Sequence, residues 1–317
     1  MTSLVGNGMA RAAFDAALAH GALHHAWLIA GPEGVGKARF ALDAATRMLA
    51  QASGAAERTQ AMIAAGSHPD LRVLTRKPKD ENKPDSDLAR SIKIDQVRAL
   101  QPLLATKPSM SERRVIVIDA VDDLERPGAS NALLKNLEEP PAGTIFLLVS
   151  HAPGRLLPTI RSRCRLLRFD PLSDEEVREV LAGQVPDATP AEIAALVRAA
   201  GGSPGRALRF AGLQLAVLED DLAAIARDGD PSNRRRVKLA KALGTKAAQP
   251  RYEAFLERVP AFIAEQAGRL TGPALRDALE AYDAARGLAA VSLAQSLDAG
   301  TTAFELGGLV ARLAKRS

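Results

Sequence analysis

Short apolar runs alternate with amphipathic stretches through the first half of this chain, and this alternation constrains the fold more than any other feature. The apolar runs occupy residues 26–30, 71–75, 114–118, 145–149 and 165–169. Their length and composition are typical of buried strands, whereas the stretches between them, such as residues 38–50, 94–104 and 131–139, have the period of helices. Strands that alternate with helices predict an α/β domain in which helices cover a parallel sheet. Such a sheet binds ligands at the carboxyl ends of its strands.

The second half of the chain has a different, helical pattern. Ser173 and Glu176 have the spacing of a capping box, which predicts the start of a helix. Residues 190–208 predict a helix pair, and from about residue 210 onward the chain is rich in Ala and Leu with helical periodicity. A single core stops growing at roughly 250–300 residues, so a chain of 317 residues is expected to form more than one domain. We expect three, with boundaries at 1–170, 171–209 and 210–317.

The composition of the chain excludes several classes of protein, among them disulfide-rich and membrane-spanning ones. The single cysteine, Cys164, excludes an internal disulfide and favours a reducing compartment, so we expect a cytoplasmic protein. No stretch approaches the ~20 apolar residues of a membrane span. The net charge of +5 is modest and aromatic residues make up only 3% of the chain, so any contact with DNA should be mainly to phosphates. The basic run between Arg234 and Lys241 more often solvates a helix than binds DNA.

A glycine loop follows the first predicted strand and precedes a predicted helix. Residues 31–37 read GPEGVGK, which supplies Gly31, Gly34, Gly36 and Lys37 in the pattern of a phosphate-binding loop. Glycines let backbone N–H groups approach phosphate oxygens, and the lysine reaches the β and γ phosphates. The next residue is Ala38, where the motif requires a Ser or Thr hydroxyl to bind magnesium. The loop therefore predicts a nucleotide site that lacks one metal ligand.

A second departure lies at the end of the third predicted strand. Asp119 ends that apolar run and is the residue expected to hold magnesium through water. Ala120 follows it, at the position where hydrolysing proteins of this architecture normally carry a glutamate. Loss of a general base typically costs about 10²–10⁴-fold in rate. We interpret the nearby Asp122 and Asp123 as solvated loop charges, so both departures predict a pocket that does not hydrolyse ATP.

Three motifs then follow in order: NALLK at residues 131–135, LEEPP at 137–141 and SRC at 162–164. With the upstream glycine loop and the downstream GGSPGRAL at 201–208, they resemble the clamp-loader ATPases of the AAA+ superfamily over about two-thirds of the chain. Ala38 and Ala120 favour a non-hydrolysing subunit over the ATP-hydrolysing gamma and tau subunits.

The resemblance implies roles for single residues. The arginine of the SRC motif, Arg163, would be an arginine finger that acts in trans on ATP bound to a neighbouring subunit. The family's second sensor arginine falls at Gly205, and Arg206 is displaced from it by one position, a rotation of about 100° on a helix. Residues 51–66 contain no cysteine, so we expect no zinc module. Weak binding of ATP or ADP remains compatible with the glycine loop, and no cofactor is expected to be required.

The resemblance also implies partners and an activity. We expect a P-loop domain, a helical lid and a helical oligomerisation collar in a stator-like subunit of the bacterial DNA polymerase III clamp loader, itself without ATPase or polymerase catalysis. Its expected partners are the gamma/tau and delta subunits, with the sliding clamp and primed DNA contacted through the complex, and no membrane. The alternatives are an ATP-hydrolysing gamma/tau-like subunit and another oligomeric AAA+ ATPase.

Overall fold

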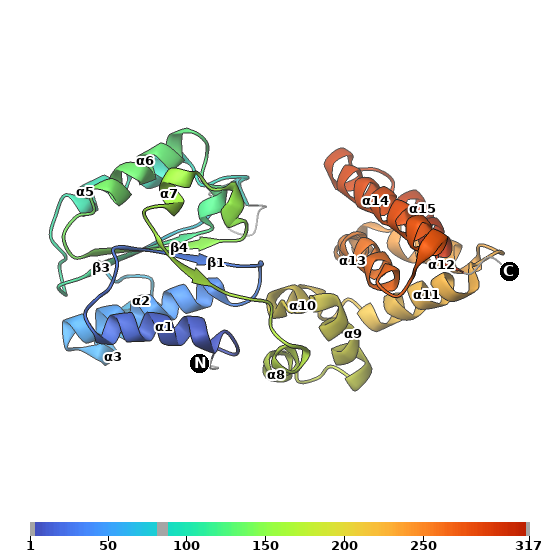
Figure 1. The fold of residues 1–317 in the computed structure, drawn as a ribbon, viewed down its shortest axis with the longest axis horizontal. Coiled ribbons are helices and arrows are strands. Elements are labelled where there is room, and N and C mark those ends of the chain that lie inside the picture. The colour runs from blue at the N-terminus through green and yellow to red at the C-terminus, as the bar shows by residue number, and fades with distance from the viewer. Residues whose placement is uncertain (1–3, 81–87, 315–317) are drawn as a thin grey trace. The chain divides into compact units, whose positions relative to one another are not determined.

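The computed structural model describes residues 4–80 and 88–314, and the chain divides into two compact units, Met1–Glu176 and Val177–Ser317 (Figure 1). The first unit contains the whole sheet, and the second is helical. The further division at residue 210 stays a prediction. Among the described residues, no helix combines the length and the apolar character needed to cross a bilayer.

The first unit is built on a five-stranded parallel sheet with the order β2-β3-β4-β1-β5. The strands are β1 (Ala26–Ala30), β2 (Leu71–Leu74), β3 (Arg114–Asp119), β4 (Thr144–Ser150) and β5 (Arg165–Arg168). The predicted parallel α/β fold is therefore confirmed. The prediction that all five strands are buried is wrong for β2 and β5, because these two lie at the sheet edges and remain largely exposed.

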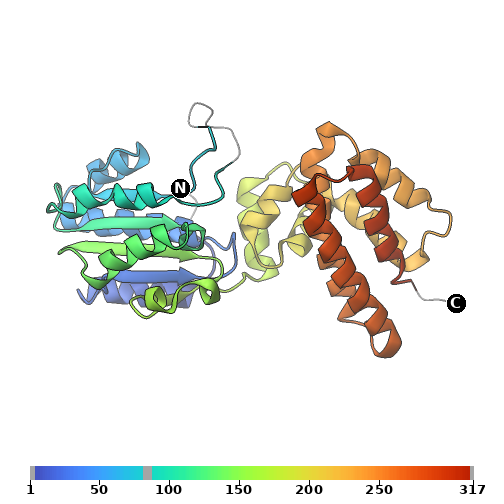
Figure 2. The same ribbon diagram turned by 90° about the horizontal axis from the view of Figure 1, so that it is seen from above.

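Helices cover both faces of this sheet (Figures 1 and 2). One face carries α1 (Gly8–Ala19), α2 (Lys37–Ser53) and α3 (Ala56–Ala64). The other carries α4 (Ile94–Arg98), α5 (Gln101–Leu104), α6 (Gly128–Glu138) and α7 (Pro158–Arg161), with the short 3-10 turns η1 (Val121–Asp123) and η2 (Pro153–Arg155). The stretch 94–104 forms two helices rather than one, because Pro102 has no N–H to continue the hydrogen bonds of α4.

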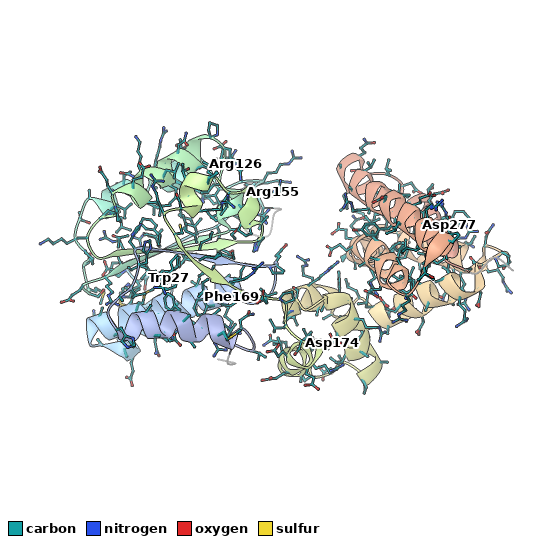
Figure 3. The ribbon with its side chains drawn as sticks, viewed as in Figure 1. Trp27, Arg126, Arg155, Phe169, Asp174 and Asp277 are labelled. Carbon is teal, nitrogen blue, oxygen red and sulfur yellow. The ribbon has the colours of Figure 1, made fainter. Side chains whose placement is uncertain are left out.

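Aromatic rings join α1 and α2 to the sheet. The ring of Phe14 lies 5.0 Å from that of Trp27 in β1 and 5.4 Å from that of Phe40 in α2, in edge-to-face geometry. Phe40 also packs on Phe169, which follows β5, at 5.2 Å. Figure 3 labels Trp27 and Phe169 between the sheet and these helices. Edge-to-face pairs contribute beyond the area they bury, so this cluster fixes the helices that flank the glycine loop.

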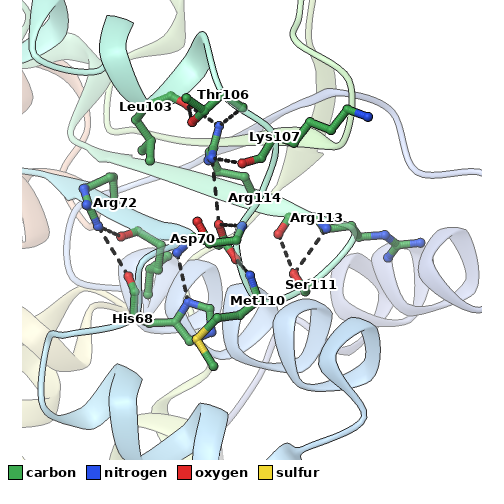
Figure 4. A network of polar contacts seen from close by, with 12 residues as sticks. His68, Asp70, Arg72, Leu103, Thr106, Lys107, Met110, Ser111, Arg113 and Arg114 are labelled. Atoms are coloured by element: carbon green, nitrogen blue, oxygen red, sulfur yellow. Dashed lines mark hydrogen bonds and ion pairs between the residues drawn. The ribbon is translucent and has the colours of Figure 1, made fainter.

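A buried ion pair lies at the amino-terminal end of β3 (Figure 4). Asp70 is fully buried and Arg114 is 1% exposed, with 3.8 Å between Oδ1 and Nη2. The carboxylate also accepts hydrogen bonds from the backbone N–H groups of Ser109 and Met110, both at 2.7 Å. The guanidinium donates to the backbone carbonyls of Leu103, Thr106 and Lys107. These contacts hold the loop that enters β3 against the start of β2.

The second unit packs its helices around an apolar core. The helices are α9 (Pro190–Ala200), α10 (Pro204–Phe210), α11 (Leu215–Asp228), α12 (Arg234–Leu243), α13 (Gln249–Ala267), α14 (Gly272–Gln295) and α15 (Ala299–Ala311), with the turn η3 (Lys246–Ala248). Helices α14 and α15 lie side by side (Figure 2). Helix α8 (Asp174–Gln184) starts at the boundary between the units. Its predicted capping box is confirmed, because Ser173 N donates to Glu176 at 2.8 Å and Glu176 N donates to Ser173 at 3.3 Å.

Candidate functional site

The glycine loop joins the carboxyl end of β1 to the start of α2, at the edge of the sheet where ligands bind. Gly34 and Gly36 have φ angles of 80° and 93°, in the left-handed region that favours glycine. Gly31 needs its missing side chain for another reason, because a Cβ there would lie 1.9 Å from the carbonyl oxygen of Phe169. The three glycines predicted from the motif therefore shape the loop in the way that a phosphate cradle requires.

Lys37 turns back onto this loop. Its side chain is 2% exposed, and its ammonium donates hydrogen bonds to the backbone oxygens of Gly31, at 2.7 Å, and Pro32. Burial lowers the pKa of Lys37 to about 8, although Asp119 and Asp122 oppose this shift. The lysine is thus held by carbonyl dipoles, and a phosphate would supply the negative charge that restores its ordinary pKa.

The ends of β3 and β4 lie beside the loop, because β4 pairs with both β3 and β1. Burial raises the pKa of Asp119, the last residue of β3, while His151 and Lys37 act in the opposite direction. Asp122 accepts hydrogen bonds from Ser150 Oγ at 3.0 Å and from the backbone N–H of His151 at 2.6 Å. Asp122 therefore ties the end of β4 to the turn that follows β3.

The interpretation as a solvated loop charge is wrong for Asp122, whereas Asp123 stays partly exposed. Asp122 has the two hydrogen bonds just described, and Asp123 forms an ion pair with Arg76 at 3.1 Å. The sequence placed both residues after β3, but it did not show which strand lies next to β3. The contact with Ser150 follows from that neighbour relation.

The groups at this end of the sheet provide only part of a magnesium site. A magnesium site in a phosphate loop uses a hydroxyl from the residue after the lysine and an acidic side chain after the neighbouring strand. Here Asp119 remains at the end of β3, but Ala38 provides no hydroxyl, and Ala120 stands where hydrolysing proteins carry the glutamate that activates water. Asp122 uses its oxygens to hold Ser150 and His151. The glycine loop therefore has the backbone shape of a phosphate-binding loop but lacks the hydroxyl ligand for magnesium and the glutamate that activates water.

Arg163 lies near the amino ends of the strands, whereas the glycine loop lies at their carboxyl ends. It stands just before β5, whose first residue, Arg165, pairs with Trp27 near the start of β1. The glycine loop follows the other end of β1, so the strand rise separates the two sites by roughly 20 Å. Nη2 of Arg163 lies 2.8 Å from Oε1 of Glu138, and its Nη1 donates to the backbone oxygen of Thr159 at 3.0 Å. Sequence reasoning assigned no role to Glu138, since nothing in the motif indicates this pairing.

Cys164, the next residue, is not a nucleophile in this environment. Burial raises the pKa of its thiol to about 12, so the thiolate is scarce near neutral pH. Its partly buried side chain packs against the apolar core of the first unit. Cys164 therefore acts as a small apolar residue beside β5.

Arg206 and several basic residues of α12 form ion pairs within the second unit. Arg206 lies in α10 and forms an ion pair with Glu257 at 3.4 Å. Asp221 of α11 lies 3.4 Å from Arg235 and 3.0 Å from Lys238, which both belong to α12. Arg236 pairs with Asp230 at 3.6 Å, and its guanidinium lies over the ring of Phe304 at 4.7 Å. Much of the charge between Arg234 and Lys241 is therefore balanced within the unit, which favours a structural role for α12.

The comparisons with known proteins agree with these motifs. The family model described as DNA polymerase III, delta subunit matches residues 7–173. A DNA polymerase III subunit delta′ of Pseudomonas aeruginosa is 39% identical over 194 residues, which are 59% of this chain and 56% of that protein. One from Bacillus subtilis is 35% identical over 166 residues, 51% of this chain and 47% of that protein. The chain therefore spans about half the length of these relatives. A DNA polymerase III subunit tau of Escherichia coli is 31% identical over 266 residues, 80% of this chain and 38% of that protein.

Proposed function

This chain belongs to the DNA polymerase III delta-subunit family, and on that premise we propose that it is a non-hydrolysing, stator-like subunit of the clamp loader, similar to delta′. In this role it packs against a gamma/tau subunit and supplies Arg163 to the ATP bound there. The delta subunit is a second partner. The sliding clamp and primed DNA are contacted through the complex.

One observation carries the non-hydrolysing part of the proposal: the phosphate loop is intact while its catalytic surroundings are absent. Lys37 remains buried in the loop, but alanines stand at positions 38 and 120. Without a hydroxyl for magnesium and a glutamate for water, the metal ion beside bound ATP would keep only Asp119 of its two expected protein ligands, and the attacking water would have no general base. Nucleotide binding is thereby separated from hydrolysis.

The position of Arg163 supports an action in trans. Its own phosphate loop lies at the other edge of the sheet, roughly 20 Å away along the strands. A guanidinium is always charged and presents several N–H donors to phosphate oxygens. In related phosphoryl-transfer enzymes an arginine supplied in trans accelerates hydrolysis about 10³–10⁵-fold. A chain that does not hydrolyse ATP can therefore still control hydrolysis by its neighbour.

A gamma/tau-like ATPase is the second candidate, and the match to a tau subunit over 80% of this chain favours it. This alternative predicts that the purified chain alone releases phosphate from ATP in the presence of magnesium. Ala38 and Ala120 oppose it, because each removes a group on which hydrolysis depends.

The experiment reconstitutes the loader from this chain and its own gamma/tau and delta partners. We expect Arg163→Ala to slow ATP hydrolysis about 10³-fold or more at the one site that Arg163 faces, and to slow clamp loading on primed DNA. Arg161→Ala is the matched control, since it removes an exposed arginine two positions away.

Unchanged turnover and loading with Arg163→Ala would remove the finger from the proposal. Sustained, magnesium-dependent phosphate release by the purified chain alone would instead favour the ATPase alternative.

A further inference from the structure

The arginine that the proposed function assigns to a neighbour's ATP already has a partner within the chain. Arg163 pairs with Glu138 at 2.8 Å and donates to the backbone oxygen of Thr159 at 3.0 Å. Glu138 is the last residue of α6, and Arg163 lies just beyond the end of α7. Two packed helices thus give the guanidinium a defined resting position.

Glu138 occupies a place where its helix disfavours a negative charge. The carboxyl end of a helix carries partial negative charge, so an acidic side chain in the last turn is less favourable there than a basic one. A nearby guanidinium offsets this repulsion. The local electrostatics of α6 therefore favour the pairing of Glu138 with Arg163.

The pair is also weak enough to open. The side chains of Arg163 and Glu138 are 33% and 48% exposed, and water screens an ion pair of that exposure. A triphosphate offers the same guanidinium several charged oxygens in a geometry that accepts two parallel hydrogen bonds. Phosphate can therefore displace the carboxylate, whereas water alone leaves the pair largely closed.

We propose that Glu138 is a positioning residue that holds Arg163 in the resting chain and competes with a neighbour's ATP for it. The inference rests on the proposed function, because it presumes that Arg163 meets a phosphate in trans. Glu138 then acts as a brake on the neighbour's hydrolysis, which is released when a triphosphate comes within reach of the guanidinium.

The test measures ATP hydrolysis by the reconstituted loader with Glu138→Gln, which removes the charge and keeps the size of the side chain. We expect kcat/KM for ATP to rise about 1.5- to fivefold, the range that exposed ion pairs provide. In the Arg163→Ala background the same substitution is expected to change nothing. Glu139→Gln is the matched control, because Glu139 is the next residue, is exposed, and forms no ion pair with the described part of the chain.

A second measurement uses the chain alone. A dicarbonyl reagent that modifies arginine, read out by mass spectrometry of the peptide containing Arg163, should label that residue faster in Glu138→Gln than in the parent chain or in Glu139→Gln.

The outcomes separate the two proposals. Unchanged hydrolysis by Glu138→Gln, or an equal rise in the Arg163→Ala background, overturns the brake even where Arg163→Ala itself impairs the loader. If Arg163→Ala has no effect on the loader while labelling is faster in Glu138→Gln, the finger is refuted although the resting pair is real.

Discussion

Replacing Asp70 with asparagine is expected to cost the first unit about 3–5 kcal/mol of unfolding free energy. The carboxylate accepts two backbone hydrogen bonds of 2.7 Å and faces the guanidinium of Arg114. An asparagine keeps one acceptor and turns an N–H₂ group toward the other donor, which leaves a buried N–H unpaired at about 1–3 kcal/mol. It also leaves Arg114, which is 1% exposed, without its counter-charge. Breaking a buried pair from one side costs about 3–5 kcal/mol in total.

Urea denaturation followed by tryptophan fluorescence measures this loss in the first unit alone, because Trp27 is the single tryptophan of the chain and lies in β1. With a slope of about 2 kcal/mol/M, the midpoint should fall by about 1.5–2.5 M. Asp95→Asn is the control, since Asp95 pairs with Arg98 at 3.9 Å but is 88% exposed. We expect that change to stay within about 0.5 kcal/mol. The two ion pairs have nearly the same distance between charges and differ in burial. Equal losses of unfolding free energy from Asp70→Asn and Asp95→Asn would therefore refute the argument that burial determines the loss.

Two further predictions concern the glycine loop. The affinity of the chain for ATP should fall about tenfold between pH 7 and pH 9, because the charged form of Lys37 binds phosphate and its pKa of about 8 makes that form scarce as the pH rises. Calorimetric titration measures the affinity. The same dependence of affinity on pH in Lys37→Ala would contradict this reasoning. Gly31→Ala should destabilise the first unit by at least about 2 kcal/mol, because its Cβ would lie 1.9 Å from a backbone oxygen. Urea denaturation followed by tryptophan fluorescence measures this loss. An equal loss in Gly154→Ala, where a Cβ would have open space, would show that the clash is not the cause.

The elements of the first unit could be predicted because each is specified locally. The apolar run at residues 114–118 became β3, with Asp119 added at its end, and the run at 26–30 became β1. The exposure of β2 and β5 could not be predicted in the same way. Which strands lie at the edges depends on the strand order, and that order follows from how helices pack across the sheet rather than from the composition of any one strand.

The same distinction applies to the candidate site. The glycine loop with Lys37 is contiguous in sequence, so the motif alone predicts which positions need glycine and why. The contact of Asp122 with Ser150 and that of Glu138 with Arg163 each join segments that are distant in sequence. A charge pattern does not indicate such partners, because they are chosen by the neighbours that the sheet brings together.

The opposite placement of the glycine loop and Arg163 gives the first unit a direction along its strands. In the proposed complex such units would meet head to tail, with the glycine loop of one unit facing the arginine of the next. In that complex, the junction formed by the glycine loop of this chain would not hydrolyse ATP, so the series of hydrolysing junctions would end there. In a ring of identical ATPase subunits all junctions are equivalent. In a proposed assembly that contains this chain, one junction differs from the others and gives the order of subunits a defined end.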